Sequence, residues 1–188
     1  MKRILLLVVL LCQYFVSGAR STADTIFLKN IPQQKTLSRL SFSLNTSVND
    51  SLHWKFRNAD SSVFADPLYN DSHWTVTNSL LYTGDSTRQR LQKGPSWFRL
   101  VMIADSNQVG FVYNLVFHNS GALKVYLDGK CIAQRGVFSR QGKADYQTLK
   151  LNPVFFTVTQ AGVHTLAVEY ENNAALDDMT NWGFSAAL

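Results

Sequence analysis

The sequence predicts an all-β protein folded as a two-sheet jelly-roll β-sandwich, and three observations carry that prediction. Apolar and polar residues alternate in short runs, which is the period of half-buried strands. Beyond the N-terminal segment, no apolar stripe at helical spacing lasts for roughly 11 residues or more. Charged residues make up 16% of the 188 residues and aromatic residues 12%, which excludes disorder and a charged coiled coil. These patterns predict about eight or nine strands, which favours a jelly roll over a seven-strand immunoglobulin domain.

The first 19 residues have the pattern of a secretory signal peptide. Lys2 and Arg3 precede an apolar run, and the small residues Ser17 and Ala19 mark a cleavage site after Ala19. An uncleaved signal anchor is the alternative. A lipid anchor on Cys12 is disfavoured because leucines precede it where a lipobox needs small residues. We therefore expect export across the inner membrane to the periplasm or the extracellular space.

The rest of the chain is expected to form one domain. Residues 20–50 are predicted to be an N-terminal lead-in with the first strand, and residues 51–188 the jelly-roll β-sandwich. No later run approaches the roughly 18 apolar residues of a membrane-spanning helix. The basic residues are scattered rather than gathered in a stripe, so no nucleic-acid partner is expected. Membrane contact is expected only through an uncleaved signal anchor or a downstream segment.

The individual strands are predicted from alternation and from the turns beside them. Leu40 to Asn45 and Leu52 to Arg57 alternate, and residues 58–94 are rich in turns, with a short helical turn at Asp71–Trp74. Asp128-Gly129 is the strongest hairpin signal. Later strands are expected at 97–103, 110–118, 122–127, 130–133, 154–158, 163–170 and 183–188. The residues predicted to be buried are Phe42, Trp54, Val125, Leu127, Leu166, Val168 and Tyr170.

Several motifs then follow one another in a recognisable order. They are Trp54-Lys-Phe56, Asn70-Asp-Ser-His-Trp74, Gly94-Pro-Ser-Trp-Phe-Arg99, Gly121 to Gly129 and His164 to Tyr170. This series resembles galactose-binding-like jelly rolls, such as the sugar-binding domain of family 2 glycosidases. It is most similar to the periplasmic N-terminal region of bacterial membrane sensor histidine kinases, in which the blocks end in a Gly-Phe strand, here Gly183-Phe184. One residue departs from the pattern of these jelly rolls, because Ala59 stands before Asp60 where they usually have Gly.

Most of these motif residues are interpreted as structural. Asp71 and Trp74 are expected to close a loop against the end of the sandwich, and Arg99 to pair with a carboxylate or with loop carbonyls. Gly129 supplies the positive φ of the hairpin. The structural set is Trp54, Asp71, Trp74, Trp97, Arg99, Asp128 and Gly129.

No catalytic site is expected. The four histidines are far apart, and Cys131 is interpreted as a packed small hydrophobe. Carboxylates for glycoside hydrolysis could come from Asp66, Asp71, Asp177 and Asp178, but such acids in loops are more often turn residues. No cofactor is expected, although oxygen ligands of this kind would also suit a structural calcium ion.

Two functions stay open. The kinase resemblance implies a non-catalytic extracytoplasmic sensor that binds a small ligand or a protein partner. The alternative is a carbohydrate-binding or accessory module of a polysaccharide-degrading system, whose four tryptophans would supply stacking rings. Binding is expected on the two longest loop regions, where Tyr69 and Trp182 would otherwise only cap the sandwich. The candidate ligand-binding residues are Tyr69, Asn70, Tyr82, Asp85, Asn172, Asn173 and Trp182.

Overall fold

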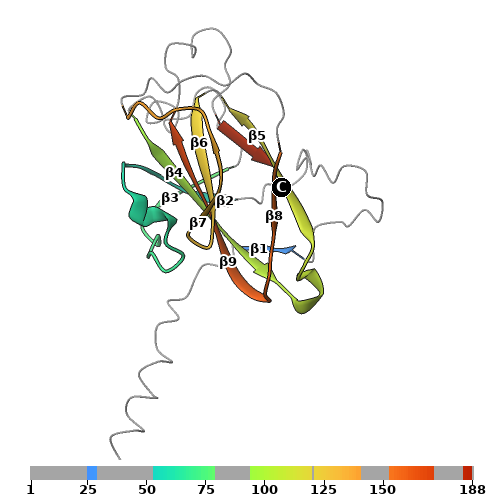
Figure 1. Ribbon diagram of the computed structural model, residues 1–188. Helices are drawn as coiled ribbons and strands as arrows, with labels where there is room; N and C mark the ends of the chain where they lie inside the picture. Colours follow the sequence, from blue (N-terminus) through green and yellow to red (C-terminus); the bar gives the residue numbers. More distant parts are fainter. Residues whose placement is uncertain are drawn as a thin grey trace, which may run out of the picture.

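The computed structural model describes residues 25–28, 53–78, 94–119, 121–140, 153–171 and 184–187. Within these residues the chain forms strands and two short 3-10 turns, η4 (Ser62–Ala65) and η5 (Ser106–Gln108). The prediction of an all-β fold is confirmed for this part of the chain (Figure 1). In the same ranges no helix is long and apolar enough to span a bilayer.

The described strands form two sheets. In the large sheet, β1 runs parallel to the C-terminal half of β4, and all other neighbours are antiparallel. Its strands, in spatial order, are β3 (Thr75–Asn78), β2 (His53–Asn58), β4 (Ser96–Ala104), β9 (Gly162–Glu171), β6 (Ala122–Leu127) and β7 (Lys130–Arg135), with β1 (Thr25–Phe27) beside β4. The small sheet, which is antiparallel, has the order β10 (Phe184–Ala187), β5 (Val112–Asn119) and β8 (Val154–Thr157).

Each expected strand that falls on described residues is present, with ends shifted by a residue or two. The strand expected around Leu40, and with it Phe42, lies outside the described residues. The sequence did not predict β1 or β3. Both are too short for alternation to be visible, and β3 follows directly on the turn after Asp71.

The two sheets enclose one apolar core. On β4, Phe98, Leu100 and Met102 point inward, and they pack with residues of β5 and β8 from the facing sheet. The burial predicted for Trp54, Val125, Leu166, Val168 and Tyr170 is confirmed. Leu127 is only partly buried, because it ends β6 beside the exposed hairpin turn. A two-sheet β-sandwich is therefore confirmed.

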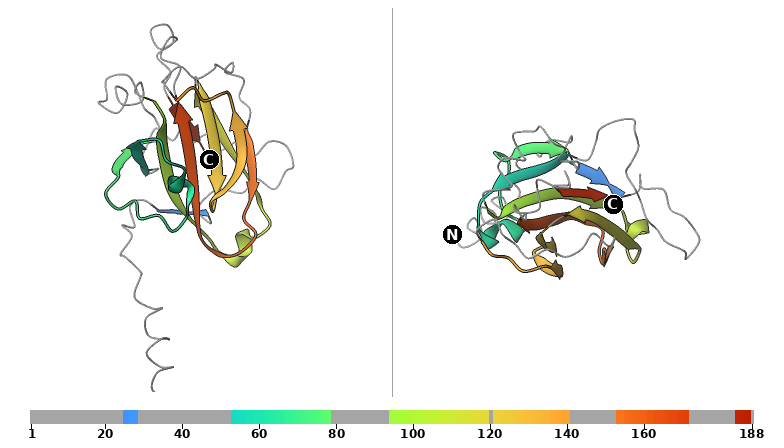
Figure 2. Two further views of the ribbon diagram at one scale, coloured as in Figure 1. Left: turned by 60° about the vertical axis from the view of Figure 1, so that its left-hand side comes forward. Right: turned by 90° about the horizontal axis from the view of Figure 1, so that it is seen from above.

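The outer face of the large sheet is covered by residues 59–74, which we call the covering loop. It contains η4 and lies on the opposite side of the large sheet from β5 and β8 (Figures 1 and 2). Phe64 and Trp74 of this loop pack on Trp97 and Ala167 of the sheet. The helical turn predicted at Asp71–Trp74 is a single turn closed by a hydrogen bond from Trp74 N–H to Asp71 O, at 3.0 Å.

The β6–β7 hairpin also contacts the covering loop. Asp128 and Gly129 both have positive φ, +49° and +82°, as a two-residue type I′ turn requires. A Cβ at position 129 would stand 3.2 Å from Pro67 Cδ. Glycine therefore serves both the turn and the close approach of the loop.

Candidate functional site

The outer face of the large sheet carries charged and aromatic side chains in two cross-strand rows. Antiparallel register sets the rows, because residues opposite one another on neighbouring strands share a face. One row runs Lys55, Arg99, Ala167 and Tyr126, and the other runs Arg57, Trp97, Glu169 and Lys124. Polar residues on a half-buried face need partners, which the covering loop supplies for Lys55, Arg99 and Arg57 and Arg140 supplies for Glu169.

Asp71 of the covering loop closes the first row. Its two carboxylate oxygens bind Lys55 Nζ at 2.9 Å and Arg99 Nε at 2.8 Å. Arg99 also donates to the carbonyl oxygens of Phe64 and Asp66, the latter at 3.0 Å. The guanidinium is almost fully buried, so this ion pair fastens the loop to the sheet.

The pKa of Asp71 reflects both burial and these cations. Burial alone would raise the pKa, but the hydrogen bonds and charges of Arg99 and Lys55 outweigh it and hold the pKa below its ordinary 3.8. Asp71 is therefore a permanent anion at neutral pH. A carboxylate in that state cannot serve as a general acid.

Aromatic rings fill the space between the covering loop and the sheet. Phe64 meets Trp74 at 5.0 Å and Trp97 at 5.8 Å between ring centroids, both edge-on, and Trp97 stacks on Tyr126 at 5.5 Å. Trp54, Trp74 and Trp97 are all buried. None of these three can offer a free ring face to a ligand, and Trp182 lies outside the described residues.

Two of the seven candidate ligand-binding residues are described, and both order the covering loop. Tyr69 is half-buried against Phe64, and its hydroxyl accepts a hydrogen bond from Arg57 Nη1 at 3.3 Å. Asn70 is exposed, and its Oδ1 accepts the N–H of Ser72 at 3.1 Å. The other five, Tyr82, Asp85, Asn172, Asn173 and Trp182, lie outside the described residues.

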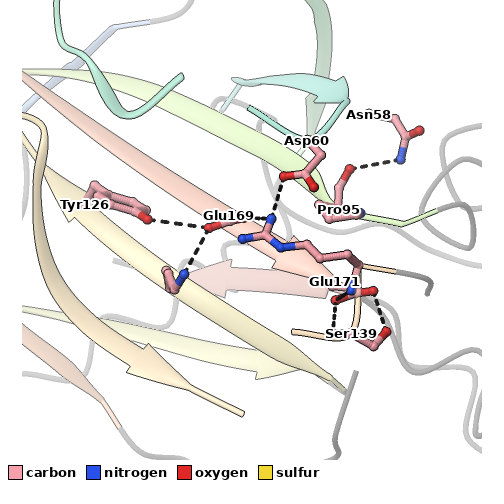
Figure 3. A network of polar contacts seen from close by, with 9 residues as sticks. Asn58, Asp60, Pro95, Tyr126, Ser139, Glu169 and Glu171 are labelled. Atoms are coloured by element: carbon pink, nitrogen blue, oxygen red, sulfur yellow. Dashed lines mark hydrogen bonds and ion pairs between the residues drawn. The ribbon is translucent and has the colours of Figure 1, made fainter. Parts of the chain in front are cut away.

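The second row centres on Glu169, whose carboxylate is buried although strand β9 presents it on the outer face. Its Oε1 accepts from Arg140 Nη1 at 2.5 Å. Its Oε2 lies 3.5 Å from the Tyr126 hydroxyl and 3.7 Å from Lys124 Nζ (Figure 3). Among the described residues these are the only hydrogen bond and ion pair of Oε2, and neither is as short as a normal hydrogen bond.

The charge of Glu169 acts on its neighbours. Burial, followed by the negative charge of Glu169, raises the pKa of Tyr126 to about 12, so Tyr126 keeps its proton and remains a donor. Burial would lower the pKa of Arg140, but the charges of Glu169 and Asp60 raise it further above its ordinary value. Both groups hold fixed protonation states at neutral pH.

Half-exposed groups surround this carboxylate. Phe138 lies beneath two cations, with Lys124 Nζ at 5.0 Å and Arg140 Cζ at 5.2 Å from its ring centroid. Arg140 also binds Asp60 Oδ1 at 2.5 Å on the solvent side. We call the set of Asp60, Lys124, Tyr126, Phe138 and Arg140 around Glu169 the Glu169 surface. It combines partly exposed aromatic side chains with fixed donors and acceptors, which is the composition of a site for a polar ligand.

The described residues offer less for catalysis or metal binding. Asp66 Oδ1 accepts the N–H of Leu68 at 2.8 Å, a turn role, and Asp71 is neutralised by its two cations. Asp177 and Asp178 lie outside the described residues. In the described ranges no three His, Cys, Asp or Glu side chains come together to hold a metal ion. The described residues therefore do not support the structural calcium ion that the sequence would allow.

Cys131 differs from its prediction. It is exposed rather than packed, because it lies on β7, the last strand of the large sheet, directly after the hairpin turn. The buried histidine next to that turn is structural. His164 Nδ1 lies 2.7 Å from Asp128 Oδ2, and Asp128 Oδ1 accepts the Thr165 N–H at 2.8 Å.

Glu169 is not among the residues singled out from the sequence, although alternation along residues 163–170 sets it on the face opposite Leu166, Val168 and Tyr170. A signal was present, because Glu is depleted in strands and here interrupts an apolar run. Its partner Arg140 could not be found that way. It lies 29 residues away, beyond a strand and a loop.

Comparison with known proteins gives similarity of structure only. The chain matches no protein-family model and no curated protein. Among solved structures it is similar to a β-glycosidase from Bacteroides vulgatus, with 17% identity over 71% of this chain and a TM-score of 0.45. It is also similar to a Bacteroides uniformis β-glucuronidase, with 20% identity over 72% of this chain and a TM-score of 0.46.

A family 2 glycosyl hydrolase from Bacteroides cellulosilyticus is similar at 14% identity and a TM-score of 0.46, over 72% of this chain. The chain spans only 19%, 17% and 19% of the lengths of these three proteins. The similarity is therefore to one segment of each of these proteins. Identity and TM-score are too low for the likeness to indicate a ligand or an activity.

Proposed function

We propose that this protein is a non-catalytic, extracytoplasmic binding module that holds a carbohydrate at the Glu169 surface. The observation that carries the proposal is the Oε2 oxygen of Glu169. It is an oxygen of a buried carboxylate, and its polar contacts among the described residues are the long ones to Tyr126 and Lys124. A buried charged acceptor is costly to leave poorly bonded, so a ligand hydroxyl placed between these groups would be favourable.

The neighbours of that oxygen suit a sugar. A carboxylate accepts hydrogen bonds from hydroxyl groups, and the Tyr126 hydroxyl and the Lys124 ammonium can donate to ligand oxygens. Phe138 is partly exposed and, beside the two cations over its ring, would supply apolar surface for the C–H groups of a pyranose. Lys124 and Tyr126 lie on β6, Glu169 lies on β9, and Phe138 lies in the segment after β7. The first two elements are neighbouring strands of one sheet.

Two further parts of the proposal rest on the sequence and a third on the structure. The galactose-binding-like jelly roll is supported by the ordered motifs from Trp54 to Tyr170. Action outside the cytoplasm is supported by the apolar N-terminal segment. Absence of catalysis is supported by the pairing of Asp71 with two cations, which leaves it unsuited to acid catalysis. Nothing observed favours the sensor role that the kinase resemblance implied, so we do not carry it forward.

A glycan array probed with the full chain tests the proposal, followed by titration calorimetry of the best glycan with two variants. Phe138→Ala should weaken binding about tenfold or more, which corresponds to about 1.4 kcal/mol. Phe155→Ala is the matched control, because Phe155 is an exposed ring on the small sheet, and it should leave the affinity unchanged. Equal losses in both variants, or no glycan bound at all, would reject the proposal.

A further inference from the structure

Residues 136–140, which follow β7, cross the outer face of the large sheet, and we call them the strap. The strap leaves the sheet at Gly136, whose φ of +68° favours glycine. Val137 points to solvent, Phe138 is half-buried, and Ser139 and Arg140 are exposed. The strap therefore contributes no side chain to the core between the sheets, and its movement would leave that core intact.

Two carboxylates of β9 hold the strap in place. Glu171, fully buried, accepts the Ser139 N–H at 2.8 Å, the Ser139 hydroxyl at 2.8 Å and the Arg140 N–H at 3.0 Å (Figure 3). Glu169 accepts from the Arg140 guanidinium. Glu169 and Glu171 are two residues apart on one strand, so their side chains lie on the same face. They bind the adjacent strap residues Arg140 and Ser139.

Arg140 is held in an unusual backbone conformation. Its φ is +63°, a left-handed value that non-glycine residues adopt at a cost. Such conformations persist where surrounding contacts enforce them, and they are common at functional sites and switches. The enforcing contacts here are the hydrogen bond to Glu171 and the ion pairs of the side chain with Glu169 and Asp60.

We propose that the strap, which contributes Phe138 and Arg140 to the Glu169 surface, is also the gate of that surface: it is closed in this structure and shifts about Gly136 to release the Glu169 carboxylate from Arg140, with Phe138 remaining beside the ligand. This inference rests on the proposed function for the identity of the ligand, but opening of the gate is a property of the chain alone. In the closed state the Glu169 side chain is only 4% exposed and Arg140 occupies Oε1, so a ligand hydroxyl reaches the carboxylate only in the open state. The apparent affinity of the ligand is then reduced by the fraction of molecules that are open.

One of the closing contacts, the Arg140–Asp60 ion pair, is exposed on both sides, whereas in the Arg140–Glu169 pair only the arginine is exposed. The side chains of Arg140 and Asp60 are 42% and 52% exposed. Ion pairs at such exposure are weak and are screened by salt. Opening should therefore increase with ionic strength, whereas the buried Asp71 ion pairs under the covering loop should respond much less.

Carboxyl footprinting tests the gate without any ligand. The full chain is labelled with a carbodiimide and glycine ethyl ester, and the labelling rates of Glu169 and Asp71 are read by mass spectrometry. Ser139→Ala removes one bond of the strap to Glu171 at an exposed position. We expect it to raise labelling of Glu169 severalfold and to leave that of Asp71 unchanged. Added salt should act on the wild type in the same direction.

Unchanged labelling of Glu169 in both experiments would overturn the gate, as would a parallel rise at Glu169 and Asp71, which would mean general loosening. Where a glycan has been found, Ser139→Ala should tighten its binding severalfold, and weaker or equal binding would also overturn the gate. If Glu169 labels as expected while no glycan binds, the gate stands and the proposed carbohydrate function fails.

Discussion

Asp71 shows how one residue fixes a loop of the chain on a sheet. It joins Lys55 and Arg99, which are 16 and 28 residues away in sequence. Ion pairs at this depth contribute little net stability compared with apolar packing, but removing one partner leaves buried charges uncompensated. Substituting Asp71 therefore destabilises the fold mainly because Lys55 and Arg99 stay buried without a counter-charge.

The first prediction concerns this ion pair and acid. Because the pKa of Asp71 is lower in the fold than its ordinary 3.8, its contribution to stability is complete above about pH 4. It is lost as the pH falls through the lower folded value. Asp71→Asn should destabilise the protein by about 3 to 5 kcal/mol at neutral pH. It should also make the free energy of unfolding depend less on pH below about pH 4. Urea unfolding as a function of pH measures both effects.

Asp66→Asn is the control for that measurement, because Asp66 is an exposed turn residue of the same loop. It should change stability by about 0.5 kcal/mol or less at neutral pH. Equal effects of the two substitutions would mean that Asp71 does not hold the covering loop.

The second prediction is a titration at the Glu169 surface. Tyr126 should ionise near the value of about 12 rather than its ordinary 10.0, because burial and then the charge of Glu169 disfavour the phenolate. Stability linked to Tyr126 is therefore complete below about pH 10 and is lost as the pH rises through the folded value. Ultraviolet difference absorbance follows the titration. Glu169→Gln should move the pKa of Tyr126 toward 10, and no movement would show that Glu169 does not act on this hydroxyl.

At the scale of elements, alternation along β9 separates two tasks within one strand. Leu166, Val168 and Tyr170 fill the core, whereas Glu169 and Glu171 face the strap. A shift of register by one residue would exchange these faces, so the core and the site are specified together.

The third prediction tests this assignment. Tyr170→Ala removes a fully buried ring from the core and should cost about 3 to 5 kcal/mol of unfolding free energy, as for other large aromatic residues. Val163→Ala lies on the same strand at an exposed position and should cost about 0.5 kcal/mol or less. Chemical denaturation of both variants measures the difference, and a near-neutral Tyr170→Ala would show that the faces are assigned wrongly.

Local patterns predicted the elements better than the site. Alternation and the Asp128-Gly129 turn were sufficient for β2, β4 to β9 and the terminal strand β10. Strands of three or four residues such as β1 and β3 carry too little pattern to be recognised. Exposure of Cys131 and partial exposure of Leu127 depend on which strands end the sheet and where the hairpin lies, and neither is a local property.

At the scale of the whole molecule, the candidate site lies on the outer face of the large sheet rather than on the tips of loops alone. The ligand-binding residues were predicted on the two longest loop regions because loops often carry binding residues. The Glu169 surface instead draws on β6, β9, the strap and the start of the covering loop, which meet only once strand order and register are known. Trp182 and its four companion residues outside the described ranges stay predictions.

The most direct test of the central claim, that a carbohydrate binds at the Glu169 surface, is nuclear magnetic resonance mapping of the best glycan from the array onto the full chain. We expect the shifts of Lys124, Tyr126, Phe138 and Arg140 to change together on titration, while those of Val112 and Phe155 on the outer face of the small sheet stay fixed. Shift changes confined to Val112 and Phe155, with the Glu169 surface unchanged, would contradict it.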